Sequence, residues 1–359
     1  TRVPRSRLAR STSLTTAAPP DSLGRGRGAS GGNPRHPPRL RNGVTPSPLL
    51  SRPGAVPADA PDEGVAAHYG DPYAEQRRLA AGEALVDLSH RGVIRISGPD
   101  RLSWLHSLVT QHVEHLAPGV PTQALVLSPQ GHVEHHLHLV DDGTAVLAHV
   151  EPGTTDALID FLRRMQFMLR VEVEDVTSSY AVVADPEPRL VERSYLAEYD
   201  GPVAGVMASE ALRVAARIPR LGLDTDHRTI PHEVGWLRTA VHLDKGCYRG
   251  QETVARVHNL GRPPRRLVLL HLDGSDSELP ATGDPVQLDG RDVGRVGTAV
   301  RHYELGPIAL AVIKRNVPDD AALTAGPVAA AIDPASADEE PVSEARAAAA
   351  ARAGLLRFR

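Results

Sequence analysis

The sequence predicts an α+β domain with antiparallel sheets and packed helices, followed by a small β-barrel. Two observations predict the first domain. Apolar and polar residues alternate as in antiparallel strands over residues 124–150, and helical apolar spacing stands on both sides of this stretch. The third observation is a change after Pro264, where short strand-like runs separated by glycine turns replace the helical spacing. Short, closely spaced strands close best as a barrel or a sandwich, so a second, all-β domain is expected.

The chain of 359 residues divides into four predicted segments. Residues 1–61 are rich in Arg, Pro and Ser and have no periodic apolar pattern, so they are predicted to form a disordered tail. The α+β domain is assigned to 62–263, the β-barrel to 264–328 and an Ala-rich tail to 329–359. Because the first segment is rich in Arg and Ser and poor in acidic residues, it also resembles an organellar transit peptide.

Local patterns place the elements of the α+β domain in order. Helices are predicted over Ala74–Leu85 and over 151–165. Asp100 is expected to cap another helix, because its carboxylate can accept hydrogen bonds from the free amides of the first turn. Strands are predicted at 92–97, 124–127, 132–140, 145–150, 171–173, 180–183 and 213–217.

The patterns that follow lead into the barrel. Ile230–Leu237 is predicted to run extended and then into a short helix, and another helix is predicted to begin at Gln251. Asp289-Gly290-Arg291-Asp292 is a strong hairpin-turn sequence, because tight hairpin turns need residues that accept positive φ. The barrel strands are predicted at 266–272, 285–288, 293–299 and 308–313.

Composition excludes several classes of function. The net charge is −4 and no basic stripe is interleaved with aromatic residues, so direct nucleic-acid binding is not expected. No apolar run approaches the ~20 residues of a membrane-spanning helix, so no membrane partner is expected. The single cysteine, Cys247, rules out an internal disulfide and cannot alone supply the ligands of a zinc or iron–sulfur site. We expect a reducing cytoplasm as the location, with the mitochondrial matrix as the alternative.

The most informative stretch is Asp244–Glu252, which contains the only cysteine and one of only two lysines. Gly246 and Gly250 free the backbone for a tight loop that runs into the following helix. Lys245 stands two residues from the sulfur, and the free amides of the helix start lie close by. Both would favour a thiolate and lower the pKa of Cys247. We therefore predict Cys247 and Lys245 as the reactive pair. The alternative is that Cys247 is a small buried residue beside a structural turn.

Two other features carry alternative interpretations. Glu233 stands at a helix start, where a carboxylate either complements the helix dipole or accepts two hydrogen bonds from an amino-pyrimidine edge such as that of a pterin. In the strand 132–140, a period of two would place His132, Glu134, His136 and His138 on one face. Neighbours on that face are ~6.6 Å apart, which is too wide for one metal ion, so no metal site is predicted.

The run Lys245–Glu252 reads K-G-C-Y-R-G-Q-E, and Pro231-His232-Glu233 precedes it. It resembles the signature of the YgfZ-type folate-binding proteins, whose mitochondrial relatives act in iron–sulfur cluster assembly. The resemblance implies a fold like that of the aminomethyltransferase of glycine cleavage, with α+β subdomains around a folate pocket and a β-barrel after them. It also implies a tetrahydrofolate-binding accessory protein that maintains or repairs 4Fe–4S enzymes, including a tRNA-modifying one, under oxidative stress.

The same resemblance assigns roles to residues and partners. Cys247 is the residue that the family needs, and Glu233 is the expected pterin anchor. The expected partners are folate and either client iron–sulfur enzymes or cluster-assembly proteins. The residues expected to shape the loop around the cysteine and the folate are Lys245, Tyr248, Gly250, Gln251 and Glu252.

One departure ranks a transferase activity second. In the aminomethyltransferases a glycine is followed shortly by paired aspartates, whereas Gly131–His136 contains no aspartate. Glu134 or a histidine would have to replace it as the acid or base. The aminomethyltransferases also lack the cysteine of the signature. A folate-dependent aminomethyltransferase is therefore the alternative function, and a scaffold with a vestigial folate pocket is a third.

Overall fold

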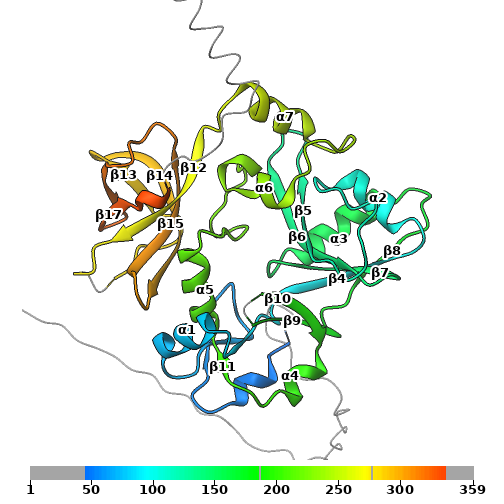
Figure 1. Ribbon diagram of the computed structural model, residues 1–359, viewed down its shortest axis with the longest axis horizontal. Coiled ribbons are helices and arrows are strands. Elements are labelled where there is room, and N and C mark those ends of the chain that lie inside the picture. The colour runs from blue at the N-terminus through cyan, green and yellow to red at the C-terminus, as the bar shows by residue number, and fades with distance from the viewer. Residues whose placement is uncertain (1–44, 186, 276–277, 337–359) are drawn as a thin grey trace, which may run out of the picture. The chain divides into compact units, whose positions relative to one another are not determined.

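The computed structural model describes residues 45–185, 187–275 and 278–336. The predicted meander forms a five-stranded antiparallel sheet in the order β5-β6-β7-β4-β8 (Figure 1). Fully buried Leu105 and Leu158 lie in one core with Leu137 of this sheet, so helices α2 and α3 cover its face. The bounds of these elements are β4 Gly92–Ser97, α2 Arg101–Leu108, β5 Thr122–Leu127, β6 Val133–Asp141, β7 Ala145–Val150, α3 Thr155–Arg164 and β8 Glu172–Asp175.

A second sheet has four strands, in the order β10-β9-β3-β11. Its β11 pairs with β3 in parallel, and the other pairs are antiparallel. Helices α1 and α5 contact each other and share a core with β3 through Leu79, Val86 and Val206. The bounds are α1 Pro72–Ala80, β3 Leu85–Asp87, β9 Tyr180–Ala184, β10 Pro188–Glu192, α4 Ser194–Glu198, β11 Val203–Ala204 and α5 Val206–Ala215.

The C-terminal strands close into a barrel in the order β12-β15-β14-β13-β16-β17, and pairing of Leu270 with Ile332 joins the last strand to the first. Asp289 and Gly290 both have positive φ, 51° and 73°, which confirms the predicted hairpin turn. The predicted fold class is thus confirmed. The bounds are β12 Arg265–Leu272, β13 Pro285–Leu288, β14 Arg291–His302, β15 Gly306–Lys314, β16 Ala322–Ala325 and β17 Val328–Ile332.

Short elements connect the two sheets and the barrel. Helix α6 (Trp236–Ala240) follows the 3₁₀ turn η2 (Pro231–Glu233), and helix α7 (Gln251–Leu260) leads to the barrel. Near the start, η1 (Pro48–Ser51) precedes a two-stranded sheet of β1 (Val56–Pro57) and β2 (Ala66–His68). None of the helices that the structure describes is long and apolar enough to cross a membrane.

Three predictions about local structure were wrong. Residues 213–217 do not form a strand, because helix α5 buries Ala208, Ala211 and Val214 at helical spacing and runs to Ala215. The first helix ends at Ala80, since Gly82 has a φ of 71° and terminates it before β3. Asp100 is the N-cap residue of α2, as predicted, but the expected capping bond is missing, because Arg170 donates to its carboxylate at 2.8 to 3.1 Å.

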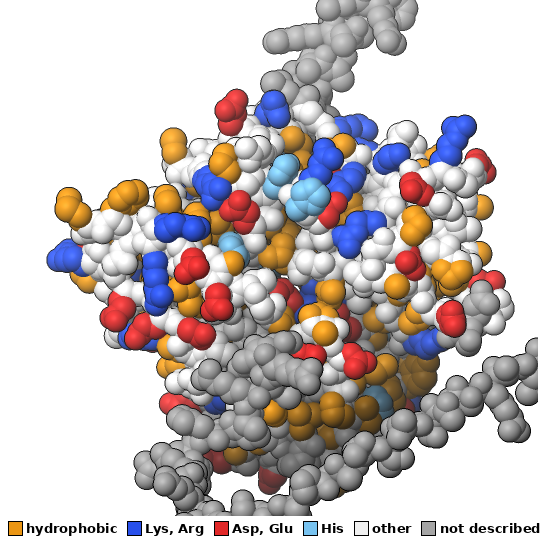
Figure 2. Space-filling view, turned by 180° about the vertical axis from the view of Figure 1, so that it is seen from behind, with side chains coloured by type: hydrophobic (Ala, Val, Ile, Leu, Met, Phe, Trp, Pro, Cys, Tyr) orange, Lys and Arg blue, Asp and Glu red, His pale blue; other side chains and the backbone are white. Residues whose placement is uncertain are grey.

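Parts of both predicted tails, residues 45–61 and 329–336, belong to the described structure. Part of the segment predicted as a disordered tail, 1–61, is structured, because Leu49 of η1 is buried in a core with Leu85. The barrel extends past 328, since β16 and β17 complete it. The rest of both predicted tails, residues 1–44 and 337–359, lies outside the described residues. On the face shown in Figure 2, basic and acidic side chains are interspersed, with no stripe of one charge.

Candidate functional site

Cys247 is exposed in the loop between α6 and α7. The interpretation of Cys247 as a buried residue beside a turn is therefore wrong. The helix predicted after it is confirmed and begins at Gln251, after Gly250 with a φ of 82°. The loop thus presents the thiol to the solvent. The contacts of the other loop residues hold the loop in place.

Lys245 fastens one end of this loop to helix α2. Its ammonium is buried and donates hydrogen bonds to the carbonyl oxygens of His106, Val109, at 2.6 Å, and Gln111, at 3.3 Å. These carbonyls lie at and just beyond the end of α2, where backbone acceptors lack helical partners. Burial lowers the pKa of Lys245 to about 8. An ammonium has three N–H donors, and those of Lys245 bond the three carbonyl oxygens. Lys245 therefore anchors the loop and has no donor left for the Cys247 sulfur. Lys245 was predicted to form a reactive pair with Cys247, and the structure gives it the role of an anchor for the loop instead.

At the other end of the loop, Gly250 packs closely against the turn between β5 and β6. A Cβ atom at Gly250 would lie 2.6 Å from the carbonyl oxygen of Ser128. On the opposing side, a Cβ at Gly131 would lie 2.8 Å from Cβ of Thr253 in α7. The two glycines thus let the start of α7 pack directly on this turn, which only residues without a side chain allow.

We expect Gly250→Ala to destabilise the protein by about 2 kcal/mol or more, because the new methyl group meets backbone and the residue must keep a positive φ. Gly246→Ala is the matched control in the same loop, since a Cβ there meets nothing within 4 Å. Thermal unfolding followed by circular dichroism measures both. Equal melting temperatures for the two variants would contradict the close packing described above.

Of the other loop residues predicted to bind the cofactor, Tyr248 and Gln251 stabilise the loop itself. Tyr248 is buried beside Trp236 and Val254, and burial raises its pKa to about 12. The side-chain amide of Gln251 donates to the carbonyl of Lys245 at 3.3 Å and so closes the loop. Glu252 is exposed in the first turn of α7. Contact of these residues with folate stays a prediction.

Glu233, the predicted pterin anchor, is fully engaged within the protein. Its side chain is 1% exposed, and its two oxygens each accept a hydrogen bond of 2.8 Å from Arg265 of β12. The backbone amide of Ile230 donates a third bond at 3.1 Å. A pterin could reach this carboxylate only by displacing Arg265, so the geometry gives Glu233 the role of tying η2 to the barrel.

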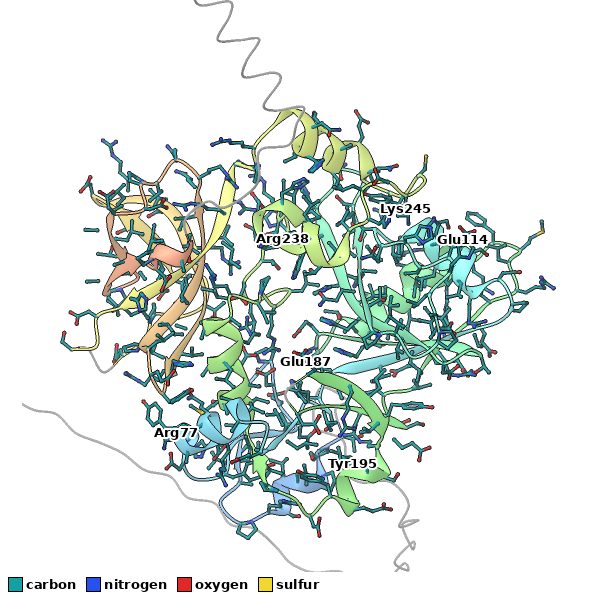
Figure 3. The ribbon with its side chains drawn as sticks, in the orientation of Figure 1. Arg77, Glu114, Glu187, Tyr195, Arg238 and Lys245 are labelled. Carbon is teal, nitrogen blue, oxygen red and sulfur yellow. The ribbon has the colours of Figure 1, made fainter. Side chains whose placement is uncertain are left out.

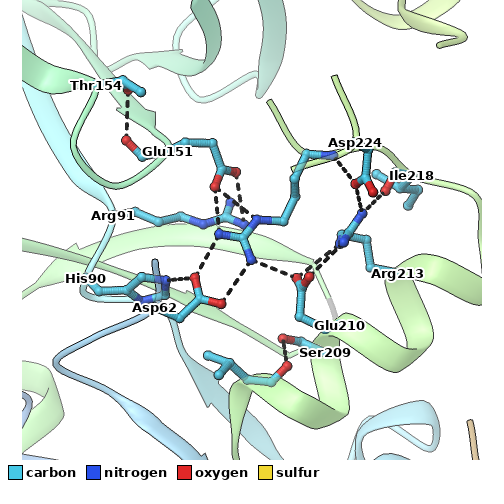
Figure 4. A network of polar contacts seen from close by, with 12 residues as sticks. Asp62, His90, Arg91, Glu151, Thr154, Ser209, Glu210, Arg213, Ile218 and Asp224 are labelled. Carbon is cyan, nitrogen blue, oxygen red and sulfur yellow. Dashed lines mark hydrogen bonds and ion pairs between the residues drawn. The ribbon is translucent and has the colours of Figure 1, made fainter. Parts of the chain in front are cut away.

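A buried ionic network, which the sequence did not reveal, joins segments distant in the chain (Figure 4). Arg220 is 4% exposed and contacts Asp62 at 2.8 Å, Glu151 at 2.7 Å and Glu210 at 3.1 Å. Burial alone would raise the pKa of Asp62, but hydrogen bonds from His90 and Arg220 hold it well below its usual value. Despite burial, the pKa of Glu151 is lowered as well, by the charges of Arg91 and Arg220. Arg220 shares the balance of charge with Arg91, which lies 3.6 Å from Glu151, and with Arg213, which lies 2.7 Å from Glu210.

Beside this network, rings form a stack in which His136, His149 and Trp236 are buried and His138 is half-buried. The ring of His136 lies 4.5 Å from Trp236 and 4.4 Å from His138, and His138 stacks on His149 at 4.7 Å with an angle of 3°. Burial lowers the pKa of His138 to about 4 and those of His136 and His149 well below the ordinary value, so the rings are neutral. Arg91 adds to each of these shifts, which places its charge near the stack.

The stack corrects the predicted face of β6. Val133 pairs with Leu127 but His135 pairs with Val126, so a bulge at Glu134 shifts the alternation by one residue. Val133 therefore packs near Trp236, on the side of His136, while Glu134 is exposed and pairs with Arg249 at 3.0 Å. His136 and His138 share a face as predicted, but Glu134 does not share it with them.

Several buried polar atoms of the stack and of the segment 87–91, which leads into β4 beside β7, have no hydrogen-bond partner among the described residues. Such atoms are normally paired, so they mark positions where a ligand or water completes the structure. A flat ring surface with unpaired donors and acceptors beside it suits a heteroaromatic ligand that has polar edges. The atoms are Asp87 Oδ2, Ser89 Oγ, His90 Nδ1, Arg91 Nε and His149 Nδ1.

Comparison with known proteins agrees with this architecture. Residues 265–351 match the family described as CAF17, C-terminal beta-barrel domain. The fold is aminomethyltransferase-like, and its barrel is similar to the CAF17 barrel domain. The crystal structure of glycine cleavage system aminomethyltransferase T from Bartonella henselae superposes with a TM-score of 0.65 and 16% identity, over 79% of this chain and 93% of that one.

The curated relatives are named either as transferases or as an iron–sulfur cluster assembly factor. A chloroplastic protein of Arabidopsis thaliana that is named a transferase is 26% identical over 60% of this chain, and a mitochondrial IBA57 homolog of Mycosarcoma maydis, named an iron–sulfur cluster assembly factor, is 27% identical over 55%. An aminomethyltransferase of Rippkaea orientalis is 23% identical over 68% of this chain and 81% of its own length. The chain spans 61% and 59% of the lengths of the first two relatives.

Proposed function

We propose that this protein binds tetrahydrofolate and acts as an accessory protein in the assembly or repair of iron–sulfur clusters, with Cys247 as the working thiol. The observation that carries the proposal is the exposed Cys247 on a loop fixed at both ends, by Lys245 to α2 and by Gly250 to the β5–β6 turn. A thiol held outward in this way is accessible to another macromolecule. The similarity to a named cluster assembly factor and to the YgfZ-type signature points to the same use.

One thiolate cannot hold a cluster by itself, because protein-bound clusters take four ligands. The proposed partner, a cluster-assembly protein or a client iron–sulfur enzyme, must supply the others. Cys247 then acts as a transient ligand or as a thiol that forms a mixed disulfide. The chloroplastic and mitochondrial names of the first two relatives favour the mitochondrial matrix over the cytoplasm as the compartment.

The histidine stack and the unpaired atoms around it fit a folate. The stack offers a flat, neutral surface for a pterin ring, and His90, Arg91 and His149 offer unpaired nitrogens for its polar edge or its carboxylates. Folate-dependent aminomethyltransferases are among the relatives, which supports this choice of ligand. A bound tetrahydrofolate would supply a one-carbon unit or the reducing power of its ring. Aminomethyl transfer itself is not proposed, since Gly131–His136 contains no aspartate and Glu134, one of the candidates to replace it, is exposed and paired with Arg249.

The thiol is tested by complementation of a strain that lacks its own copy of this protein. Cys247→Ser is expected to restore iron–sulfur enzyme activity no better than an empty vector under oxidative stress, because a hydroxyl is a poor ligand for iron and forms no disulfide. The variant should keep the wild-type melting temperature, since residue 247 is exposed. Gly246→Ala is the control from the same loop and should restore full activity. Full rescue by Cys247→Ser would remove the thiol from the proposal.

A further inference from the structure

A cluster of imidazoles and one carboxylate lies at the end of helix α2. His106 stands in the last turn of the helix, and His112 and Glu114 stand in the loop that follows. Each offers one ligand atom, and the three atoms lie within 4.8 Å of one another. Two imidazoles and a carboxylate, with further positions open, form a donor set that first-row divalent transition metals take.

The loop that carries two of these side chains is firmly anchored. Val113, between His112 and Glu114, is 0% exposed in the core of the five-stranded sheet, so its two neighbours are directed away from that core. The amide of Val113 donates a long hydrogen bond of 3.4 Å to Nδ1 of His106, which ties the loop to the helix and which a metal ion at this nitrogen would replace. Lys245 adds two further ties, because it bonds the carbonyls of His106 and Gln111. Figure 3 shows Lys245 and Glu114 close to each other.

The distances need only a modest closure. With bonds of about 2.1 Å, two ligand atoms on a tetrahedral ion are about 3.4 Å apart, so the widest separation must shrink by at most about 1.4 Å. Glu114 is exposed, so its side chain can rotate toward the rings.

Two more histidines lie around His112. Its ring is 4.6 Å from that of His106, 5.4 Å from His242 and 5.9 Å from His115. His242 lies in the segment that leads to the cysteine loop, so the cluster and this loop are neighbours. The sequence did not reveal the cluster, because its spacing follows neither a helical nor a strand period.

We propose that a divalent first-row transition metal ion binds between His106, His112 and Glu114, with its remaining positions open to water or to an external ligand. The ion is held beside the loop of Cys247, but the thiol is not one of its ligands. This site shares no ligand with the proposed folate surface and does not depend on the proposed function.

Metal binding is tested by titrating the untagged full chain with Zn²⁺ by calorimetry and with Co²⁺ by visible absorption, both without oxygen. We expect one equivalent of each to bind. The Co²⁺ complex should show d–d bands without an intense thiolate-to-metal band, and Mg²⁺ should not bind, because imidazole does not suit it. No saturable binding by the wild type, or a strong thiolate band, would overturn the proposal.

Variants identify the ligands. Glu114→Gln and His112→Ala are expected to weaken Zn²⁺ binding at least ~10-fold, since even residues that only support metal ligands contribute that much. His115→Ala and Cys247→Ser are the controls and should bind as the wild type does. Circular dichroism confirms that each variant is folded, and His112→Gln serves if His112→Ala is not. Wild-type affinity in both ligand variants, or an equal loss in the controls, would contradict this assignment.

Discussion

Acidification from pH 7 to pH 5 is expected to lower the free energy of unfolding by about 4 kcal/mol through His135 and His138 alone. Burial lowers the pKa of each to about 4, whereas an unfolded histidine titrates near 6.5. Between these values the unfolded chain binds protons that the folded chain does not. Stability therefore falls as the pH falls through this window, and His136 and His149 add to the loss.

Urea unfolding at pH 7 and pH 5 measures this effect. His138→Phe keeps a ring in the stack but cannot bind a proton, so it should lose about 2 kcal/mol less than the wild type between the two pH values. His227→Ala removes an exposed histidine and should behave as the wild type does. Equal stability of the wild type at both pH values would show that these histidines are not neutral in the folded protein.

Arg220→Met is expected to cost about 3 to 5 kcal/mol of stability, because removing one partner of a buried ion pair leaves uncompensated charge. Asp62, Glu151 and Glu210 all lose a guanidinium contact of 3.1 Å or less. Arg220→Lys should retain part of the stability, since an ammonium keeps the charge but cannot match the planar fork of arginine.

The control for Arg220 is Arg170→Met. Arg170 makes an ion pair of similar length with Asp100, at 2.9 Å, but its side chain is 73% exposed. Solvent screens such a pair, so the melting temperature should hardly change. If Arg220→Met melted at the same temperature as Arg170→Met, the buried network would not be a stabilising feature of this fold.

Local patterns predicted most elements because strands and helices are encoded by neighbouring residues. The meander 124–150 and the hairpin turn at Asp289-Gly290 are examples. The failures have identifiable physical causes. The strands β16 and β17 are rich in alanine, which has little preference for strands, and only closure of the barrel recruits them. The strand predicted at 213–217 came from a window too short to show the helical spacing of α5.

The candidate site was predicted less completely, because its contacts are long-range. Glycine punctuation located the loop of Cys247, but the carbonyls that hold Lys245 lie 134 to 139 residues away in the sequence. Likewise, nothing near Glu233 indicates Arg265, 32 residues further on. The network of Arg220 joins Asp62 to Glu210 and has no local signature. Such contacts follow from the packed fold and not from the sequence pattern.

Calorimetric titration with tetrahydrofolate tests the central claim most directly. The wild type is compared with Cys247→Ser, in the exposed loop, and with Arg91→Gln, which changes an unpaired nitrogen beside the histidine stack. We expect the wild type and Cys247→Ser to bind equally and Arg91→Gln to bind at least ~10-fold more weakly, since hydrogen bonds to charged groups contribute about 1.5 to 3 kcal/mol. No binding by the wild type, or loss of binding in Cys247→Ser, would contradict a folate surface that is separate from the thiol.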